Sequence, residues 1–207
     1  HGVTEIPDLD TSYAFYRDLG TGETQAYHLE AAKGASVSVG TSIPRIAGLD
    51  GYGVTIALVG PGLPPPTAVL PIALERGDGA IVREAADRGE FFEPFTQTTY
   101  RLGSRIETTL PDGGDYLVLV WRADHAPGKY VLDSGTAEVF GPGDLLVMPV
   151  WWVSVNAYFG HWDRIAIFGF AVGLPFLLVA RSISRRLRRR VRRRVVVGGT
   201  VRGGSPT

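Results

Sequence analysis

Four histidines are the residues best suited to binding a metal, because the chain contains no cysteine. The absence of thiols excludes a disulfide framework and thiolate metal sites. If His1 is a mature N-terminus, its α-amine and imidazole can chelate copper together, since imidazole nitrogen suits that metal. His28, in a predicted strand, or His125, in a predicted loop, could complete a nitrogen-rich site. Copper binding is therefore one hypothesis, and solvated loop histidines are the alternative.

The sequence contains no recognisable catalytic motif. The chain contains no P-loop, no GxGxxG before a helix, no GxSxG and no HExxH. The glycine-rich segments 77–80 (GDGA) and 112–115 (DGGD) are most simply explained as hairpin turns. Asp112 and Asp115 could contribute to a calcium site, but two carboxylates fall short of the ligands that calcium requires. The sequence therefore favours a non-catalytic protein without a resident cofactor, although a triad assembled only by folding stays open.

Ten arginines and no acidic residue follow position 164, so the formal net charge of zero conceals a segregation of charge. All 21 acidic residues lie in residues 1–164, which therefore carry a net charge of −10. A basic segment after a membrane span is typical of contact with anionic lipid headgroups. Nucleic-acid binding is the alternative, but it requires a further partner. The arginines assigned to anionic lipid are Arg181, Arg185, Arg186, Arg188, Arg189 and Arg190.

An uncharged apolar run, IAIFGFAVGLPFLLVA, occupies residues 165–180 and predicts a transmembrane helix. At 1.5 Å per residue the run spans about 24 Å, and flanking interfacial side chains and a snorkelling Arg181 can extend it. A buried core helix is the alternative. The positive-inside rule places the tail in the cytoplasm and the acidic body outside the cell (inner) membrane. Residues 1–25 have no export signal, so we expect that a signal peptide has been removed, with a tag remnant at His1 as the alternative.

Aromatic residues gather just before this run, where they suit either a partner contact or a belt at the lipid interface. They are Trp151, Trp152, Tyr158, Phe159 and Trp162. Gly169 and Gly173 inside the run have the GxxxG spacing of helix–helix contacts. These seven residues form the predicted interface with the membrane or with other membrane-protein subunits.

The body of the chain shows the alternation and turn residues of a β protein. Valine and tyrosine enrichment between glycine and proline turns predicts several short strands, which is typical of an antiparallel sandwich. The predicted strands are Glu23–Glu30, Ala35–Ser42, Gly53–Gly60, Arg105–Leu110, Asp115–Trp121 and Gly128–Asp133. Two segments are predicted to be helical, Pro7–Leu19 and Gly143–Phe159, and the second could lie along the membrane surface.

The segments LPDGGDYLVLVW (Leu110–Trp121) and PGKYVLDSG (Pro127–Gly135) each place a turn glycine before a tyrosine and alternating apolar residues. With the preceding residues from Phe91, this stretch resembles the second half of bacterial secreted β-sandwich domains of the pre-peptidase C-terminal (PPC-like) type. The resemblance covers about 45 residues. It implies a bacterial source and a non-catalytic binding or folding accessory, which is an analogy at the level of the fold.

The sequence therefore predicts a mainly β chain, with an antiparallel β-sandwich ectodomain and one C-terminal transmembrane α-helix. The expected parts are an extracytoplasmic domain (1–142), an interfacial connector (143–164), a transmembrane helix (165–181) and a cytoplasmic arginine-rich tail (182–207). The favoured function is a non-catalytic membrane-anchored accessory or binding protein, a subunit that packs against a larger membrane complex. The alternative is an extracytoplasmic protein that binds and delivers copper through His1.

Overall fold

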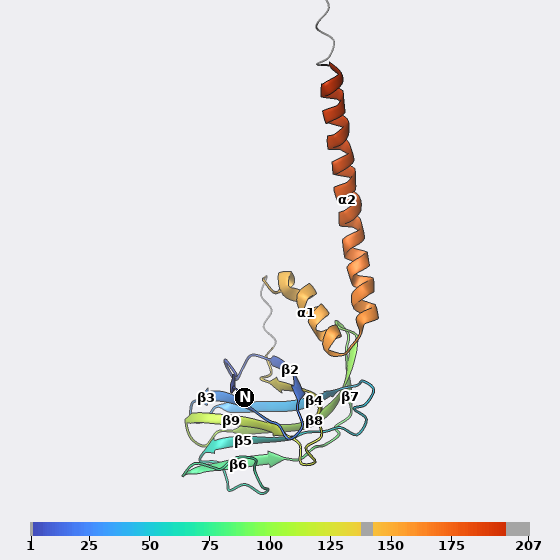
Figure 1. Cartoon of the computed structure of the whole chain (residues 1–207). Coiled ribbons are helices and arrows are strands. Elements are labelled where there is room, and N and C mark those ends of the chain that lie inside the picture. Colours follow the sequence, from blue (N-terminus) through green and yellow to red (C-terminus); the bar gives the residue numbers. More distant parts are fainter. Residues whose placement is uncertain (1, 138–142, 198–207) are drawn as a thin grey trace, which may run out of the picture. The chain divides into compact units, whose positions relative to one another are not determined.

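The computed structural model describes residues 2–137 and 143–197 and divides into two compact units, His1–Phe159 and Gly160–Thr207. The first unit contains all ten strands and helix α1 (Figure 1). The strands are β1 (Thr4–Glu5), β2 (Tyr13–Leu19), β3 (Thr24–Ala31), β4 (Ser36–Pro44), β5 (Thr55–Pro61), β6 (Asp78–Arg83), β7 (Glu90–Glu93), β8 (Thr98–Thr109), β9 (Gly114–Trp121) and β10 (Gly128–Ser134). Helix α1 spans Asp144–Tyr158, and helix α2, in the second unit, spans Trp162–Val197.

The strands form two five-stranded sheets. The first has the order β1-β3-β9-β5-β6, and the second has the order β2-β10-β4-β8-β7. All pairings are antiparallel except that of β1 with β3, which is parallel. The mainly β, two-sheet fold predicted from the sequence is confirmed, and each of the six predicted strands corresponds to an observed one within a few residues, except that β8 begins seven residues earlier.

The main core lies between the inner faces of the two sheets. Alternate residues of the strands point inward, as the two-residue period of a strand requires. Three tyrosines are among its largest fully buried side chains: Tyr27, Tyr116 and Tyr130. The hydroxyls of Tyr27 and Tyr130 lie 2.7 Å apart, and that of Tyr130 donates to Gln25 at 2.6 Å. These contacts satisfy polar groups that would otherwise be costly to bury.

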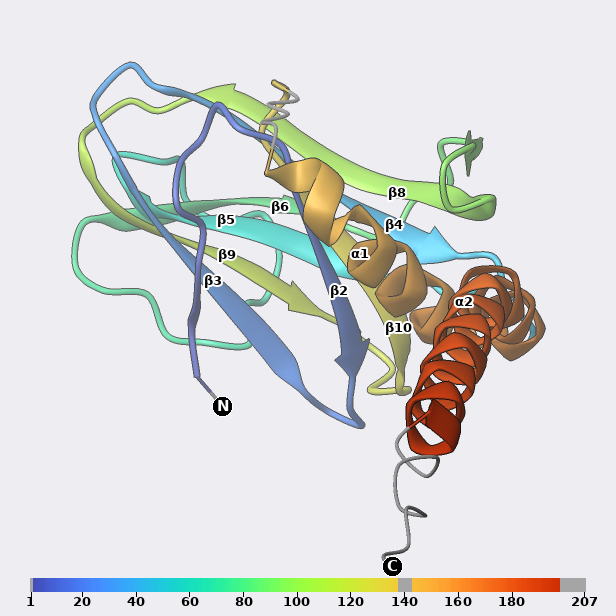
Figure 2. The ribbon, with the colours of Figure 1, turned by 90° about the horizontal axis from the view of Figure 1, so that it is seen from above.

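Helix α1 covers the outer face of the second sheet, and Figure 2 shows it crossing over β2, β10 and β4. Its C-terminal part contributes Val155 and Phe159 to a smaller apolar cluster with Tyr100 and Val131. The helix predicted at Gly143–Phe159 is therefore present, and it belongs to the same unit as the sandwich.

The helix predicted at Pro7–Leu19 is wrong, because Tyr13–Leu19 forms strand β2 along β10. The aspartate and threonine that suggest a helix start make a turn instead. The Asp8 carboxylate accepts hydrogen bonds from the backbone of Asp10 at 3.1 Å and of Thr11 at 2.6 Å. Asx turns and helix N-caps use the same residue types, which explains the error. The turn predicted at 77–80 is also shorter than expected, since β6 already begins at Asp78.

In the described part of the second unit, α2 contains one segment, Trp162–Ser184, that is long and apolar enough to cross a membrane. Large apolar side chains of this segment are exposed, and the exposed fractions of Phe170 and Phe176 are 75% and 72%. Pro175 lies inside the helix, where a membrane helix tolerates it more readily than a soluble one. The predicted run 165–180 therefore lies within a continuous helix.

Candidate functional site

A groove of about 750 Å³ lies between the N-terminal half of α1 and the outer face of the second sheet. The helix side is apolar and includes Val147, Met148 and Trp151, and Phe91 of β7 closes one end. The sheet side is mixed, with polar and charged residues from all five strands of the second sheet. A concave, largely apolar surface with a few polar groups is the usual form of a binding site.

The floor of the groove carries an ion pair that spans three strands. Arg105 on β8, Gly40 on β4 and Asp133 on β10 are aligned by the strand register, so the arginine can reach the aspartate across β4. A Cβ at Gly40 would lie 2.7 Å from Asp133 Oδ2 and 3.0 Å from Arg105 Nε. Gly40 therefore leaves the space in which the pair lies. A shift of register between Gly40 and Ser42 interrupts the ladder beside it.

The ion pair is held in a partly buried position. The guanidinium of Arg105 also donates to Ser38 Oγ at 2.8 Å, and the Arg105 and Asp133 side chains are 27% and 25% exposed. Burial raises the pKa of the Asp133 carboxyl, and the nearby positive charge of Arg105 opposes that rise. The floor therefore presents a fixed pair of opposite charges.

A chain of hydrogen bonds borders the groove and ties β7 to the sheet. The Tyr16 and Tyr100 hydroxyls lie 3.0 Å apart, Thr98 donates to Tyr100 at 3.2 Å, and the Thr96 and Thr98 hydroxyls lie 2.7 Å apart. Thr96 also donates to Glu93 through its hydroxyl and its backbone N–H. Burial raises the pKa of both Tyr16 and Tyr100, so these phenols stay neutral within the chain of hydrogen bonds.

The C-terminal half of α1 is fixed to the sheet by specific polar contacts. The Tyr158 hydroxyl lies 2.8 Å from the carbonyl oxygens of both Arg17 and Tyr130. Lys129 donates to the Tyr158 carbonyl at 2.9 Å, a position that also favours a cation beside the negative end of the helix dipole. The fully buried Asn156 donates to the Trp152 carbonyl at 3.0 Å. These contacts explain why only the N-terminal half of α1 stands over a groove.

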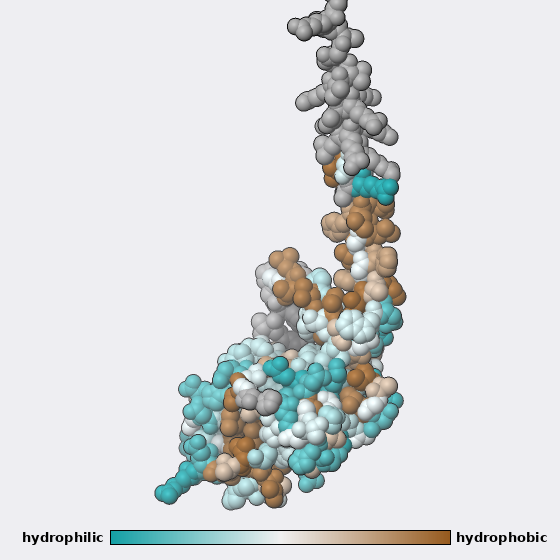
Figure 3. Space-filling model, in the orientation of Figure 1, coloured by the Kyte–Doolittle hydropathy of each residue, from teal (hydrophilic) through white to brown (hydrophobic). Residues whose placement is uncertain are grey.

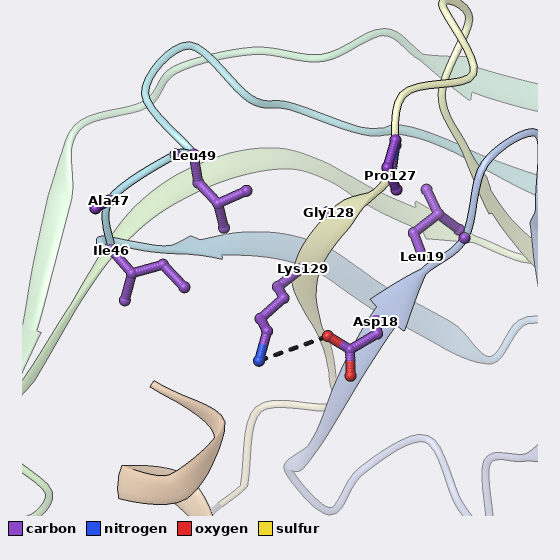
Figure 4. Close-up of a pocket in the computed structure, with 10 residues that line it drawn as sticks. Asp18, Leu19, Ile46, Ala47, Leu49, Pro127, Gly128 and Lys129 are labelled. Atoms are coloured by element: carbon purple, nitrogen blue, oxygen red, sulfur yellow. Dashed lines mark ion pairs between the residues drawn. The ribbon is translucent and has the colours of Figure 1, made fainter. Parts of the chain in front are cut away.

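A second cavity, of about 510 Å³, lies at this end of the domain and is drawn in Figure 4. It is lined by β2, β10 and the segment that follows β4, and Ala47 and Leu49 lie on one side of it. Lys129 and Asp18 form an ion pair at 3.6 Å on the other side. Because Lys129 is already engaged with α1, we assign this cavity a structural role.

The predicted aromatic residues contact the domain's own groups. The Trp151 ring stacks on Phe95 with centroids 5.6 Å apart, and Trp152 Nε1 donates to the Phe95 carbonyl at 3.2 Å. Tyr158 and Phe159 make edge-to-face contacts with Tyr16 and Tyr100, respectively. Trp151 stays 42% exposed. A role of these residues at a membrane or partner interface remains a prediction.

The remaining predicted interface residues lie on α2. Trp162 is 66% exposed, and a Cβ added at Gly169 or Gly173 would meet no atom within 4 Å. Arg181 is exposed, whereas the side chains of Arg185, Arg186, Arg188, Arg189 and Arg190 lie outside the described part. Helix–helix packing through the glycines and lipid contact through the arginines therefore stay predictions.

The described histidines do not converge. His28 lies on β3 between two carboxylates, with Nδ1 2.6 Å from Glu5 and Nε2 2.9 Å from Asp115. Both contacts raise the pKa of His28. His125 lies beside the turn at Gly22, beyond the start of β3, where its carbonyl accepts from the Gly22 N–H at 3.1 Å. At about 3.3 Å per residue of strand, the two imidazoles are too far apart for one metal ion.

The other metal candidates are similarly separated. Asp112 pairs with Lys33 at 3.1 Å, while Asp115 pairs with His28. Among the residues that the structure describes, no group of three or more His, Asp and Glu side chains has the arrangement of a metal site. His1 lies outside the described residues, so copper chelation at the N-terminus stays a hypothesis.

The groove itself was not predicted from the sequence. Arg105 and Asp133 are 28 positions apart, and Gly40 is a further 65 positions from Arg105. No local spacing links these residues, because only the pairing of β8, β4 and β10 brings them together. The one local signal is a glycine inside a predicted strand, which often marks a close approach of neighbouring groups.

Comparison with known proteins does not identify a family for this chain. No protein-family model matches the chain, and neither does any curated protein. One similar solved structure is PliG of Aeromonas hydrophila, a periplasmic inhibitor of g-type lysozyme. The two chains are 14% identical, with a TM-score of 0.36, and the match covers 64% of this chain and 94% of the other. So low a similarity bears on neither function nor partners, and the PPC-like resemblance is not confirmed.

Proposed function

We propose that the chain is a non-catalytic, membrane-tethered binding protein, which acts as an accessory subunit of a larger membrane complex. In this proposal α2 spans the cell (inner) membrane, the β-sandwich lies on the extracytoplasmic side, and the arginine-rich tail contacts anionic lipid in the cytoplasm. The groove beneath α1 receives an extracytoplasmic segment of the partner subunit.

The groove is the observation that carries this proposal. Its walls offer apolar surface to a partner, and the ion pair of Arg105 and Asp133 offers both a donor and an acceptor at a fixed position. Such a combination favours burial of a specific segment. The groove residues are engaged in hydrogen bonds and an ion pair that hold the sheet, which suits binding better than catalysis.

The tether is supported by two independent features of the chain. The segment Trp162–Ser184 has the length and composition of a membrane span. The segregation of charge, with all acidic residues before position 165 and ten arginines after it, agrees with the positive-inside rule.

A matched pair of substitutions tests the groove. Ala14 lines it from β2, opposite Asp133 on β10, and is exposed, so Ala14→Trp fills the groove without altering the core. Ala47→Trp makes the same change at an exposed position in the second cavity. Each variant is purified in mild detergent from native membranes, and the partners that accompany it are quantified.

We expect a stoichiometric membrane protein to accompany the wild type and the Ala47→Trp variant, and to be lost from the Ala14→Trp variant. Retention of the partner by Ala14→Trp would refute the groove as the binding site. Recovery of the wild-type chain without a partner would refute the role as a subunit.

A further inference from the structure

The outward face of helix α1 is apolar, unlike the surface of a typical helix that faces water. Leu146 and Val150, four residues apart, are 83% and 67% exposed, and they point away from the side that lines the groove. The chain has no charged residue from Leu145 to Phe159. A helix that is apolar all round is normally buried or in contact with lipid. The sandwich covers only one of its sides.

The single hydroxyl on this outward face is satisfied within the helix. Ser154 lies one turn beyond Val150 and donates to the Val150 carbonyl at 2.9 Å. A serine that faces water has no need of this bond, whereas a serine that faces hydrocarbon must make it. The outward face therefore offers no polar group that requires water.

The apolar surface continues beyond α1 onto β7. Phe91, on the side of β7 that faces the groove, is 49% exposed, and Phe95, which follows β7, stacks on Trp151. Figure 3 shows apolar side chains gathered on the surface of α1. A contiguous apolar surface of this kind on a domain marks a contact with a protein or a membrane.

The connectivity of the chain indicates whether a protein or the membrane covers the outward face of α1. Only residues 159–161 separate the end of α1 from Trp162, the first residue of the segment that can cross a membrane. A link of so few residues, at most about 3.5 Å each, cannot carry the end of α1 far from the bilayer surface. Lipid is therefore an apolar partner that is always close to the C-terminal end of α1.

We propose that the outward face of α1 lies in the interfacial layer of the bilayer and forms a second, peripheral membrane contact of the sandwich domain. This contact rests on the part of the proposed function in which α2 spans the membrane. It does not depend on a partner in the groove, because Leu146 and Val150 lie outside the groove lining. The contact fixes the orientation of the domain at the membrane surface, whereas attachment through α2 alone would leave the domain free to rotate.

The absence of native cysteine allows a direct test. The full chain with Leu146→Cys or Val150→Cys carries a nitroxide spin label and is reconstituted in phosphatidylcholine nanodiscs, whose lipid does not repel the acidic domain. Val69→Cys is the control, since Val69 is 92% exposed and lies between β5 and β6. Collision of each label with oxygen, which concentrates in lipid, is compared with collision with a water-soluble nickel chelate.

We expect labels at Leu146 and Val150 to favour oxygen and the label at Val69 to favour the nickel chelate. A preference for nickel at all three positions would overturn the inference, and so would low access of both reagents to Leu146 and Val150, which would mean that protein covers the face. Failure of the chain to enter nanodiscs would instead refute the membrane span. Thermal unfolding of each labelled chain verifies that the domain is folded.

Discussion

Gly40 decides whether the ion pair in the groove can form. Arg105 reaches Asp133 only by crossing β4 at the position where Gly40 has no side chain. The Gly40→Ala substitution should displace the pair and lower the free energy of unfolding by about 1–3 kcal/mol, the usual cost of overpacking. Gly2→Ala is the matched control, since a Cβ there meets no atom within 4 Å. Denaturant unfolding measures both, and equal stability of the two variants would contradict the role of Gly40.

His28 joins the N-terminal strand β1 to the sheet through its contact with Glu5. Hydrogen bonds to the Glu5 and Asp115 carboxylates raise the pKa of His28 above its ordinary value of 6.5. A raised pKa means that the folded state binds this proton more tightly than the unfolded state. The resulting stability is fully present below pH 6.5 and is lost as the pH rises through the folded-state pKa.

NMR titration of His28 tests this assignment. The Asp115→Asn substitution should lower the pKa of His28, because it removes a carboxylate that favours the charged imidazolium. Asp112→Asn, in the turn that precedes β9, should leave the pKa of His28 unchanged, since Asp112 pairs with Lys33. A His28 that titrates at or below its ordinary value in the wild type would contradict the geometry.

Individual partners of this kind could not be predicted from one sequence. His28 was correctly placed on a strand, but Glu5 comes from a two-residue strand that is too short to show a pattern. Asp115 is 87 positions away and reaches His28 through the pairing of β3 with β9. The strand that contains His28 could therefore be predicted from the sequence, whereas the carboxylates that raise the pKa of His28 reach it only through long-range strand pairing.

At the scale of elements, the docking of α1 depends on a few polar contacts at its C-terminal end. Tyr158→Phe removes the hydroxyl that faces the Arg17 and Tyr130 carbonyls. We expect a loss of about 1 kcal/mol in the free energy of unfolding, which is typical of one intramolecular hydrogen bond. Tyr13→Phe is the control, because the Tyr13 hydroxyl donates to the exposed Asp8 carboxylate and makes no contact with α1 that the structure records. Urea unfolding in detergent distinguishes them, and an equal cost for both would contradict the docking.

Elements with a strong periodic pattern were predictable, and those with an ambiguous start were not. Strands β3, β4, β5, β9 and β10 have alternating or continuous apolar residues between turn signals. Segment 7–19 has an aspartate and a threonine before apolar residues, which fits either a helix cap or an Asx turn, and the pairing of β2 with β10 selects the turn. The composition of α1 predicted a helix but not the side on which the sandwich lies.

At the scale of the whole molecule, the sequence contained the main features of organisation. The apolar run, the arginines after it and the acidic body before it predicted one anchor and one domain, and α2 contains the run. The groove arises only from the docking of α1 on a folded sheet, so no segment of the sequence could show it. This explains why the long apolar helix could be predicted while the groove could not.

We propose that the sandwich domain lies outside the membrane and is tethered to it by α2. The most direct measurement is cysteine accessibility in intact bacterial cells that express the full chain with an export signal, using Val69→Cys in the domain and Thr200→Cys in the tail. The native chain has no cysteine, so each variant carries one reactive thiol. We predict that a membrane-impermeant maleimide labels Val69→Cys in intact cells and Thr200→Cys only after permeabilisation. Labelling of both positions in intact cells, or of neither, would contradict the account.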